Sequence, residues 1–370
     1  MVTPGAHAGK QGWSTSPMGE SAAATAEKKK KQRSRWWRVG GTGLAIAVIA
    51  VVFAFFLPKI ASYASVWDVV KDFTWQEWAL LLGATVLNLA TFAPPWMAAL
   101  PGLRFRQAFV VTQSSTALTV IAPGGPAVGM ATSFAMLRAW GFKASAVTLA
   151  VAVTGVWNQF AILGFPVVAL ALLTVQGGKN PLLQTVALVG LAVFVAAVAG
   201  FAVGLRSDRE AKWVGDRAAE ISNWGLKLVR RGPVTWAGPA LVRFRHQTVG
   251  LLKRRWHVLT LATLAGHLTV FLVLMVSLRV TGVHESEVTA IEAFAAWSIM
   301  RIVGSLPITP GGVGVIELGL TSLLVGFGGK NAEVVAAVLV YRALTVLPTL
   351  ALGALSAATW KLHDPSRASA

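Results

Sequence analysis

Long apolar segments recur along this chain, and each is about the length that crosses a lipid bilayer. Hydrophobic residues form 55% of its 370 residues, and charged residues only 13%, against about 25% in soluble domains. A single soluble core cannot bury so much apolar surface. The sequence therefore predicts an all-α, polytopic integral membrane helical bundle, and it argues against a secreted disulfide scaffold, a disordered regulator or an ordinary cytosolic enzyme. The lack of cysteine also excludes thiol catalysis and cysteine-ligated zinc.

Six segments are predicted to cross the membrane completely, at 40–57, 76–100, 144–175, 182–205, 256–281 and 333–357. The loop 58–75 has no net charge and is expected outside, whereas 101–106 and 206–255 are basic and expected inside. This alternation places both termini in the cytoplasm and the protein in the cell (inner or plasma) membrane. The net charge of +18 is assigned to these cytoplasmic segments. Nucleic acid is not an expected partner, because no recognition motif accompanies the charge.

Three further regions complete the expected layout. Residues 1–39 are predicted to form a disordered, basic cytoplasmic tail, because they lack an apolar pattern and end in a run of Lys and Arg. The domain 40–357 is expected to lie in the membrane, and 358–370 to form a short cytoplasmic tail. Within the basic loop, 207–230 has helical periodicity, which fits either an interfacial helix or a solvated loop.

Two apolar segments are interrupted by similar Gly/Pro sequences, IAPGGPAVGM at 121–130 and ITPGGVGVIE at 308–317. Each interruption is predicted to break a re-entrant hairpin, one at 107–140 and the other at 289–327. The topology makes the two hairpins inverted, so that they enter from opposite faces. Paired broken segments of this kind are typical of inverted-repeat transporters.

The chemistry expected at such a break is electrostatic. Unwound backbone leaves N–H groups free, and the helix that restarts points its partly positive end toward the membrane midplane. A lipid phosphate would be stabilised there, and glycine would let it approach closely. The alternative is that the glycines only allow helices to pack tightly.

Charged residues within the apolar segments sharpen this prediction. Arg342 lies nine residues into the last crossing, roughly 13 Å deep, and so needs a partner or a function. Glu317 is the expected partner. Arg301 could face the same cavity or extend to an interface, and Arg138 lies nearer the membrane edge, where extension to the interface is at least as favoured. His267 has no second ligand at metal-binding spacing, so no metal site is predicted.

Enzyme motifs such as GxSxG, HExxH and a P-loop do not occur in the sequence. Neither catalysis nor a cofactor is therefore predicted. The candidate residues are assigned to substrate binding, and they are Arg301, Pro310, Gly311, Gly312, Gly314, Glu317, Arg342, Pro123, Gly124, Gly125 and Arg138.

The segment LPITPGGVGVIELGL at 306–320, with Arg301 before it, resembles the hallmark of the lysylphosphatidylglycerol synthase transmembrane region family, also called flippase-like. The first break and its continuation, 123–160, is similar to the family's looser amino-terminal motif. The resemblance covers roughly 40–357. It implies an inner-membrane protein that moves a lipid or lipid-linked group between leaflets, with functional positions at Arg301, Pro310, Gly311, Gly312, Gly314 and Glu317. Only about thirteen residues follow the last crossing, so the soluble aminoacyltransferase domain and lysyl transfer are not expected.

The leading expectation is a lipid transporter or flippase that binds an anionic or zwitterionic membrane lipid between the two hairpins. A membrane-embedded transferase, or an accessory subunit acting on a lipid carrier, is the alternative. A scaffold that recruits partners through its basic loop is a third possibility. The sequence leaves the oligomeric state open.

Overall fold

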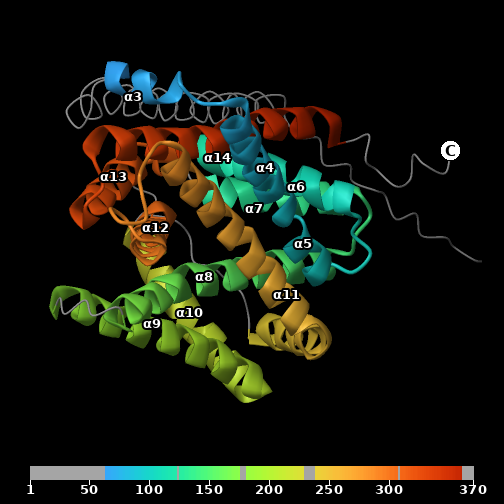
Figure 1. Cartoon of the computed structure of the whole chain (residues 1–370). Coiled ribbons are helices and arrows are strands. Elements are labelled where there is room, and N and C mark those ends of the chain that lie inside the picture. Colours follow the sequence, from blue (N-terminus) through green and yellow to red (C-terminus); the bar gives the residue numbers. More distant parts are fainter. Residues whose placement is uncertain (1–62, 123–124, 176–180, 229–237, 307–308, 361–370) are drawn as a thin grey trace, which may run out of the picture. The chain divides into compact units, whose positions relative to one another are not determined.

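The structure is a computed structural model that describes residues 63–122, 125–175, 181–228, 238–306 and 309–360. Within these ranges the secondary structure is entirely helical (Figure 1). The helices are α3 (Tyr63–Val70), α4 (Trp75–Thr91), α5 (Pro94–Ala99), α6 (Phe105–Ile121), α7 (Gly125–Ala139), α8 (Ala144–Val175), α9 (Pro181–Arg206), α10 (Asp208–Leu228), α11 (Gly238–Val280), α12 (Ala290–Ser305), the 3₁₀ turn η2 (Pro310–Gly312), α13 (Val315–Phe327) and α14 (Asn331–Thr359).

Five stretches of these helices are long and apolar enough to cross a membrane: Trp75–Ala99, Ala144–Val175, Leu188–Arg206, Val242–Val280 and Asn331–Thr359. They correspond to five of the six crossings expected from the sequence. The sixth, at 40–57, and the basic tail 1–39 lie outside the described residues. The protein is therefore a multi-pass helical membrane protein, as predicted.

The basic region 206–255 differs from the expected loop. Its first part forms the helix α10, which agrees with the helical one of the two alternatives. Residues from Gly238 onward already belong to α11, which continues without interruption to Val280. Arg and Lys are good helix formers, so a basic sequence marks the edge of the hydrocarbon and not the end of the helix. Arg245 of α11 fixes the turn before α10, because it donates to the Leu205 carbonyl at 2.9 Å and to Asp208 at 2.7 Å.

Local sequence determines where two of the helices begin. Before α4, the Thr74 backbone N–H donates to Glu77 at 2.7 Å, and the Thr74 hydroxyl accepts from the Glu77 N–H. Thr289 and Glu292 repeat this arrangement before α12, with the corresponding backbone bond at 2.8 Å. Such reciprocal caps satisfy N–H groups that the first helical turn leaves free.

Helices pack closely around α6. Helix α6 contacts α7 on one side and α14 on another (Figure 1). A β-carbon at Gly129 of α7 would lie 2.8 Å from the Ser115 carbonyl oxygen, and one at Gly353 of α14 would lie 2.7 Å from that of Gln113. Glycine at these positions lets the backbones approach, which is how helices associate where lipid removes the hydrophobic driving force.

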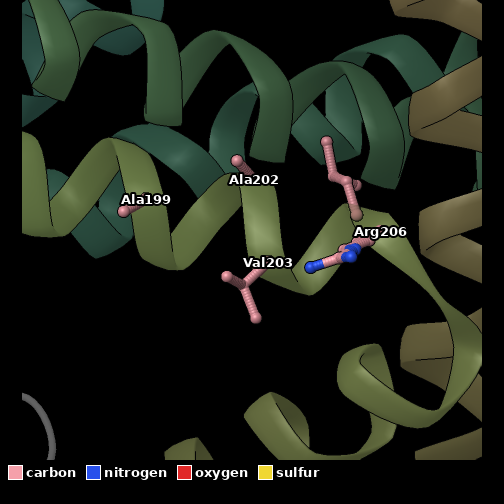
Figure 2. Close-up of a pocket in the computed structure, with 5 residues that line it drawn as sticks. Ala199, Ala202, Val203 and Arg206 are labelled. Carbon is pink, nitrogen blue, oxygen red and sulfur yellow. The ribbon is translucent and has the colours of Figure 1, made fainter.

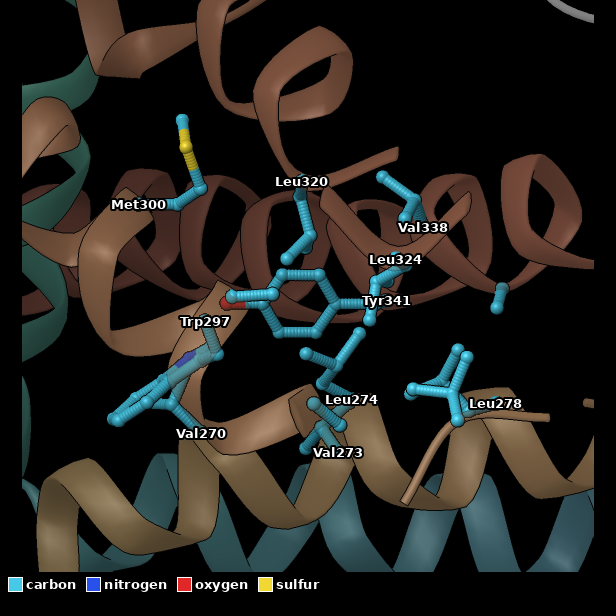
Figure 3. Close-up of a cluster of buried hydrophobic side chains, with 14 of the residues drawn as sticks. Val270, Val273, Leu274, Leu278, Trp297, Met300, Leu320, Leu324, Val338 and Tyr341 are labelled. Carbon is cyan, nitrogen blue, oxygen red and sulfur yellow. The ribbon is translucent and has the colours of Figure 1, made fainter. Parts of the chain in front are cut away.

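Of three buried clusters in the described residues, two are large. One joins α11, α12, α13 and α14, with the Tyr341 ring among Leu274, Leu320 and Leu324 (Figure 3). The other joins α5, α6, α7 and α8. The apolar part of α9, Leu188–Arg206, contributes no buried residue. An open hollow at its end is lined by Ala199, Ala202, Val203, Leu205 and Arg206 (Figure 2). All of these residues belong to α9 alone, so the hollow is not part of the polar site described next.

Candidate functional site

The second break has the backbone that its glycines allow. After α12 ends at Ser305, the chain makes the turn η2 and restarts as α13 at Val315. Gly311, Gly312 and Gly314 have φ of 62°, 68° and 85°. This left-handed region costs other residues about 1–2 kcal/mol each, so a run of three glycines is what permits the helix to stop and restart. The predicted helix–break–helix pattern over 289–327 is confirmed.

Glu317 lies in the first turn of α13, and its carboxylate closes the break. One oxygen, Oε2, accepts from the Gly314 backbone N–H at 2.5 Å, while Oε1 accepts from Nε of Arg342 at 2.6 Å. The side chain is only 3% exposed. A carboxylate is favoured here because the first turn of a helix carries partial positive charge.

Arg342 joins this turn to α14. Besides its bond to Glu317, its Nη2 donates to the Gly311 carbonyl oxygen at 3.0 Å. The guanidinium therefore holds both the carboxylate of the restarted helix and a carbonyl of the unwound segment. Its side chain is 13% exposed, so the two charges form a buried pair. The pairing expected from the sequence is confirmed.

The second break lies beside the end of α6, the helix that leads into the first break. Turn η2 contacts α6, and a β-carbon on Gly311 would lie 2.8 Å from Cγ1 of Val120. Val120 stands three residues before Pro123, the first residue of the first break. The second break therefore packs against the last turn of α6.

The described part of the first break differs in backbone from the second break. Gly125 is the first residue of α7 and has no left-handed φ, and a β-carbon there would overlap the Thr119 carbonyl of α6. Met130, which aligns with Glu317, is 52% exposed. For Gly125 the contacts therefore support close helix packing, the alternative raised from the sequence. Pro123 and Gly124 lie outside the described residues.

Arg301 belongs to a second polar cluster. Its Nη2 lies 2.9 Å from Nδ1 of His267 on α11, and its guanidinium carbon lies 5.8 Å from the ring centre of Trp297. The Tyr341 hydroxyl and Arg342 are within electrostatic range. Arg301 therefore neighbours the Glu317–Arg342 pair without bonding to it. Sequence reasoning set His267 aside as a lone histidine, because no spacing pattern links residues 34 positions apart.

Arg138 is not brought to either cluster. It lies in the last turn of α7, where its Nη1 donates to the Phe142 carbonyl oxygen at 2.5 Å. The break end of α7 is thirteen residues away, or about 20 Å along the helix. Its contact is that of a cation at a helix end. Elsewhere in the described residues, no three His, Asp or Glu side chains gather as a metal site would require.

Beyond the spans, a charged cluster holds the start of α14. Lys330 lies 2.8 Å from Glu287 and 3.6 Å from Glu333. The hydrogen bond from Lys330 lowers the pKa of Glu287, and the same bond raises the pKa of Lys330. This cluster ties the loop after α11 to the turn before α14.

A family model described as Lysylphosphatidylglycerol synthase TM region matches residues 41–353. The match includes both breaks and every residue of the two polar clusters. Among curated proteins, none matches this chain.

Proposed function

This chain belongs to the lysylphosphatidylglycerol synthase TM region family, and from that premise we propose that it moves a phospholipid or lipid-linked group between the leaflets of the cell membrane. The family name associates the fold with lipid modification in membranes. The proposal that this protein transports a lipid goes beyond what the family name says.

The observation that carries this proposal is the unwound segment Pro310–Gly314 between helices α12 and α13. Irregular backbone at membrane depth is tolerated where it is buried in protein or lines a polar cavity. Here Glu317 and Arg342 keep the turn fixed at one side, and α6 lies at the other. Helices that stop and restart in this way form the substrate sites of many secondary transporters.

The charge balance indicates which part of the segment is free for a substrate. Glu317 and Arg342 neutralise each other, and Arg342 also occupies the Gly311 carbonyl oxygen. The pair therefore serves to hold the segment in shape. We place the lipid headgroup beside the segment, next to Arg301, which no carboxylate of the described residues neutralises.

Leaflet exchange by the purified protein tests the proposal. Proteoliposomes carrying a tail-labelled fluorescent phospholipid are treated with an impermeant quencher, and the rate at which inner-leaflet lipid becomes quenched is measured. We expect faster exchange than in protein-free liposomes and a loss of about ten-fold or more in the Glu317→Gln/Arg342→Gln variant. Gly155→Ala is the control, because that glycine is exposed on α8 and has open space around it.

Two results would contradict transport. One is an exchange rate equal to that of protein-free liposomes for anionic, zwitterionic and polyprenyl-phosphate lipids alike. The other is a change in lipid mass after incubation, because that would indicate a transferase acting on the lipid.

A further inference from the structure

His267, Trp297 and Arg301 form a polar cluster inside an otherwise apolar core. His267 and Trp297 are each 1% exposed, whereas Arg301 is partly exposed. Aromatic rings surround them, and both Phe92 and Phe165 contact the His267 ring edge to face. Figure 3 shows the Trp297 indole among the side chains of this core.

Each of the three side chains has a buried nitrogen without a hydrogen-bond partner in the described residues. These nitrogens are His267 Nε2, Trp297 Nε1 and Arg301 Nε. Arg301 donates to Nδ1 of His267, so the neutral ring carries its proton on Nε2. All three unpaired groups are therefore N–H donors. Buried donors are rarely left unpaired, and three together indicate a missing acceptor.

The cluster also has unbalanced charge. Arg301 forms no ion pair within the described residues, and its charged neighbour Arg342 is already paired with Glu317. His267 is neutral when it accepts from Arg301, and the indole is neutral. The cluster therefore carries one positive charge and no counter-ion, which is costly inside a membrane.

We propose that this cluster binds a singly charged phosphate diester. One negative charge balances Arg301, and phosphate oxygens are acceptors of the kind that the unpaired donors of this cluster lack. The planar guanidinium fork suits phosphate oxygens. A phosphate monoester would bring a second charge that nothing here balances. Arg301 is partly exposed, so its guanidinium can be reached from outside the core.

This site deepens the proposed function, because it names the chemistry of the lipid headgroup. The identification of the ligand as a lipid rests on the proposed function, whereas the phosphate chemistry does not. A diester occurs in phospholipids and also in water-soluble glycerophosphodiesters. The cluster lies among aromatic side chains between α12 and α11, which is long and apolar enough to cross a membrane, so a phospholipid is the source that the surroundings favour.

Native mass spectrometry of the full-length, delipidated protein tests the site. Phosphatidylglycerol, diacylglycerol with the same chains, and glycerophosphoglycerol are titrated separately. We expect phosphatidylglycerol to bind and diacylglycerol to bind at least ten-fold more weakly. Binding of glycerophosphoglycerol as well would show that the diester alone suffices, and its failure would show that the chains are needed. Equal binding of diacylglycerol and phosphatidylglycerol would overturn the proposal.

Three variants assign the binding to the cluster. Arg301→Gln should weaken phosphatidylglycerol binding about ten-fold or more, which is the scale of a lost charge-assisted hydrogen bond. His267→Phe preserves the aromatic contacts and removes the N–H, and should weaken binding about three-fold or more. Arg217→Gln is the matched control, because Arg217 is exposed on α10 and pairs only with Glu220 in the described residues; its affinity should change less than two-fold.

Unchanged affinity for phosphatidylglycerol in both His267→Phe and Arg301→Gln would overturn the site. If Arg301→Gln does not fold, His267→Phe alone tests the site. Leaflet exchange is measured on the same proteins. Arg301-dependent binding without any exchange by the unmodified protein would contradict transport and leave the site standing. Exchange that persists in variants without binding would leave the binding site standing and would contradict its use in transport.

Discussion

The Glu317 carboxylate accepts a hydrogen bond from Nε of Arg342 at 2.6 Å, which joins residues 25 positions apart in the chain. The contact links the first turn of α13 to the middle of α14. Because Arg342 also holds the Gly311 carbonyl oxygen, the unwound segment, the restarted helix and the last crossing form one connected unit. The break is thus a structure held in place by charge, and not merely an interruption.

Removing one partner of this pair should be much more costly than removing both. Glu317→Gln leaves Arg342 buried without a counter-charge, which should lower the free energy of unfolding by about 3–5 kcal/mol. Glu317→Gln with Arg342→Gln leaves neither charge, so the double variant should regain at least half of that loss. Denaturant unfolding in mixed micelles measures all three proteins. A double variant that is no more stable than the Glu317 variant would show that the two charges do not stabilise each other.

Substitution of Gly311 should be destabilising for two reasons, which are its left-handed backbone and its close contact with Val120. Gly311→Ala places a methyl group 2.8 Å from Val120 at a φ of 62°, and the left-handed conformation alone should cost about 1–2 kcal/mol. Val120→Ala should relieve the clash but not the backbone strain. We expect a favourable coupling of about 1 kcal/mol between the two substitutions in a double-mutant cycle. Strict additivity would mean that η2 and α6 do not touch in the membrane.

The second break and its ion pair could be predicted from the sequence because both follow from local requirements. A run of Pro and Gly cannot continue a helix, and a charge deep in an apolar segment needs a partner. Glu317 was the carboxylate near the break, so Arg342 could be matched to it. That reasoning required only sequence order and the approximate depth of each residue.

Other features could not be predicted, since they depend on which helices become neighbours. His267 has no motif around it, and its contact with Arg301 arises only where α11 meets α12. Gly125 and Gly312 align in sequence, yet Gly125 starts α7 against α6 and Gly312 has a left-handed φ of 68°. The start of α11 was missed because basic residues end an apolar run without ending a helix.

The close approach of α7 to α6 should make Gly125 intolerant of any side chain. In Gly125→Ala the new β-carbon would overlap the Thr119 carbonyl oxygen, and since backbone cannot move aside as a side chain can, the helices must separate. We expect a loss of about 2 kcal/mol or more. Gly155→Ala, with nothing within 4 Å of its β-carbon, should be neutral or stabilising by about 0.5–1 kcal/mol. Equal effects of the two substitutions on unfolding would argue against the tight packing.

The expected topology can be tested with single cysteines, because the chain has none of its own. Ser286 is exposed in the loop after α11, which should lie outside, and Ser145 is exposed at the start of α8, which should lie inside. In intact cells a membrane-impermeant thiol reagent should label Ser286→Cys and should label Ser145→Cys only after permeabilisation. The reverse pattern would invert the assigned orientation, and labelling of both in intact cells would contradict the alternation of crossings.

The Lys330 cluster should make stability depend on pH at both ends of the scale. The pKa of Glu287 is lowered by Lys330, so its contribution to stability is present above the ordinary glutamate pKa, about 4.5, and is lost as pH falls through the lower folded value. The pKa of Lys330 is raised, so that contribution is present below about 10.5 and is lost as pH rises through the higher folded value. Lys330→Met should therefore flatten the melting temperature against pH in both windows, compared with the unmodified protein. The difference should shrink in 1 M salt, because exposed charges are screened. A variant whose profile parallels that of the unmodified protein at both ends would show that the cluster does not form in solution.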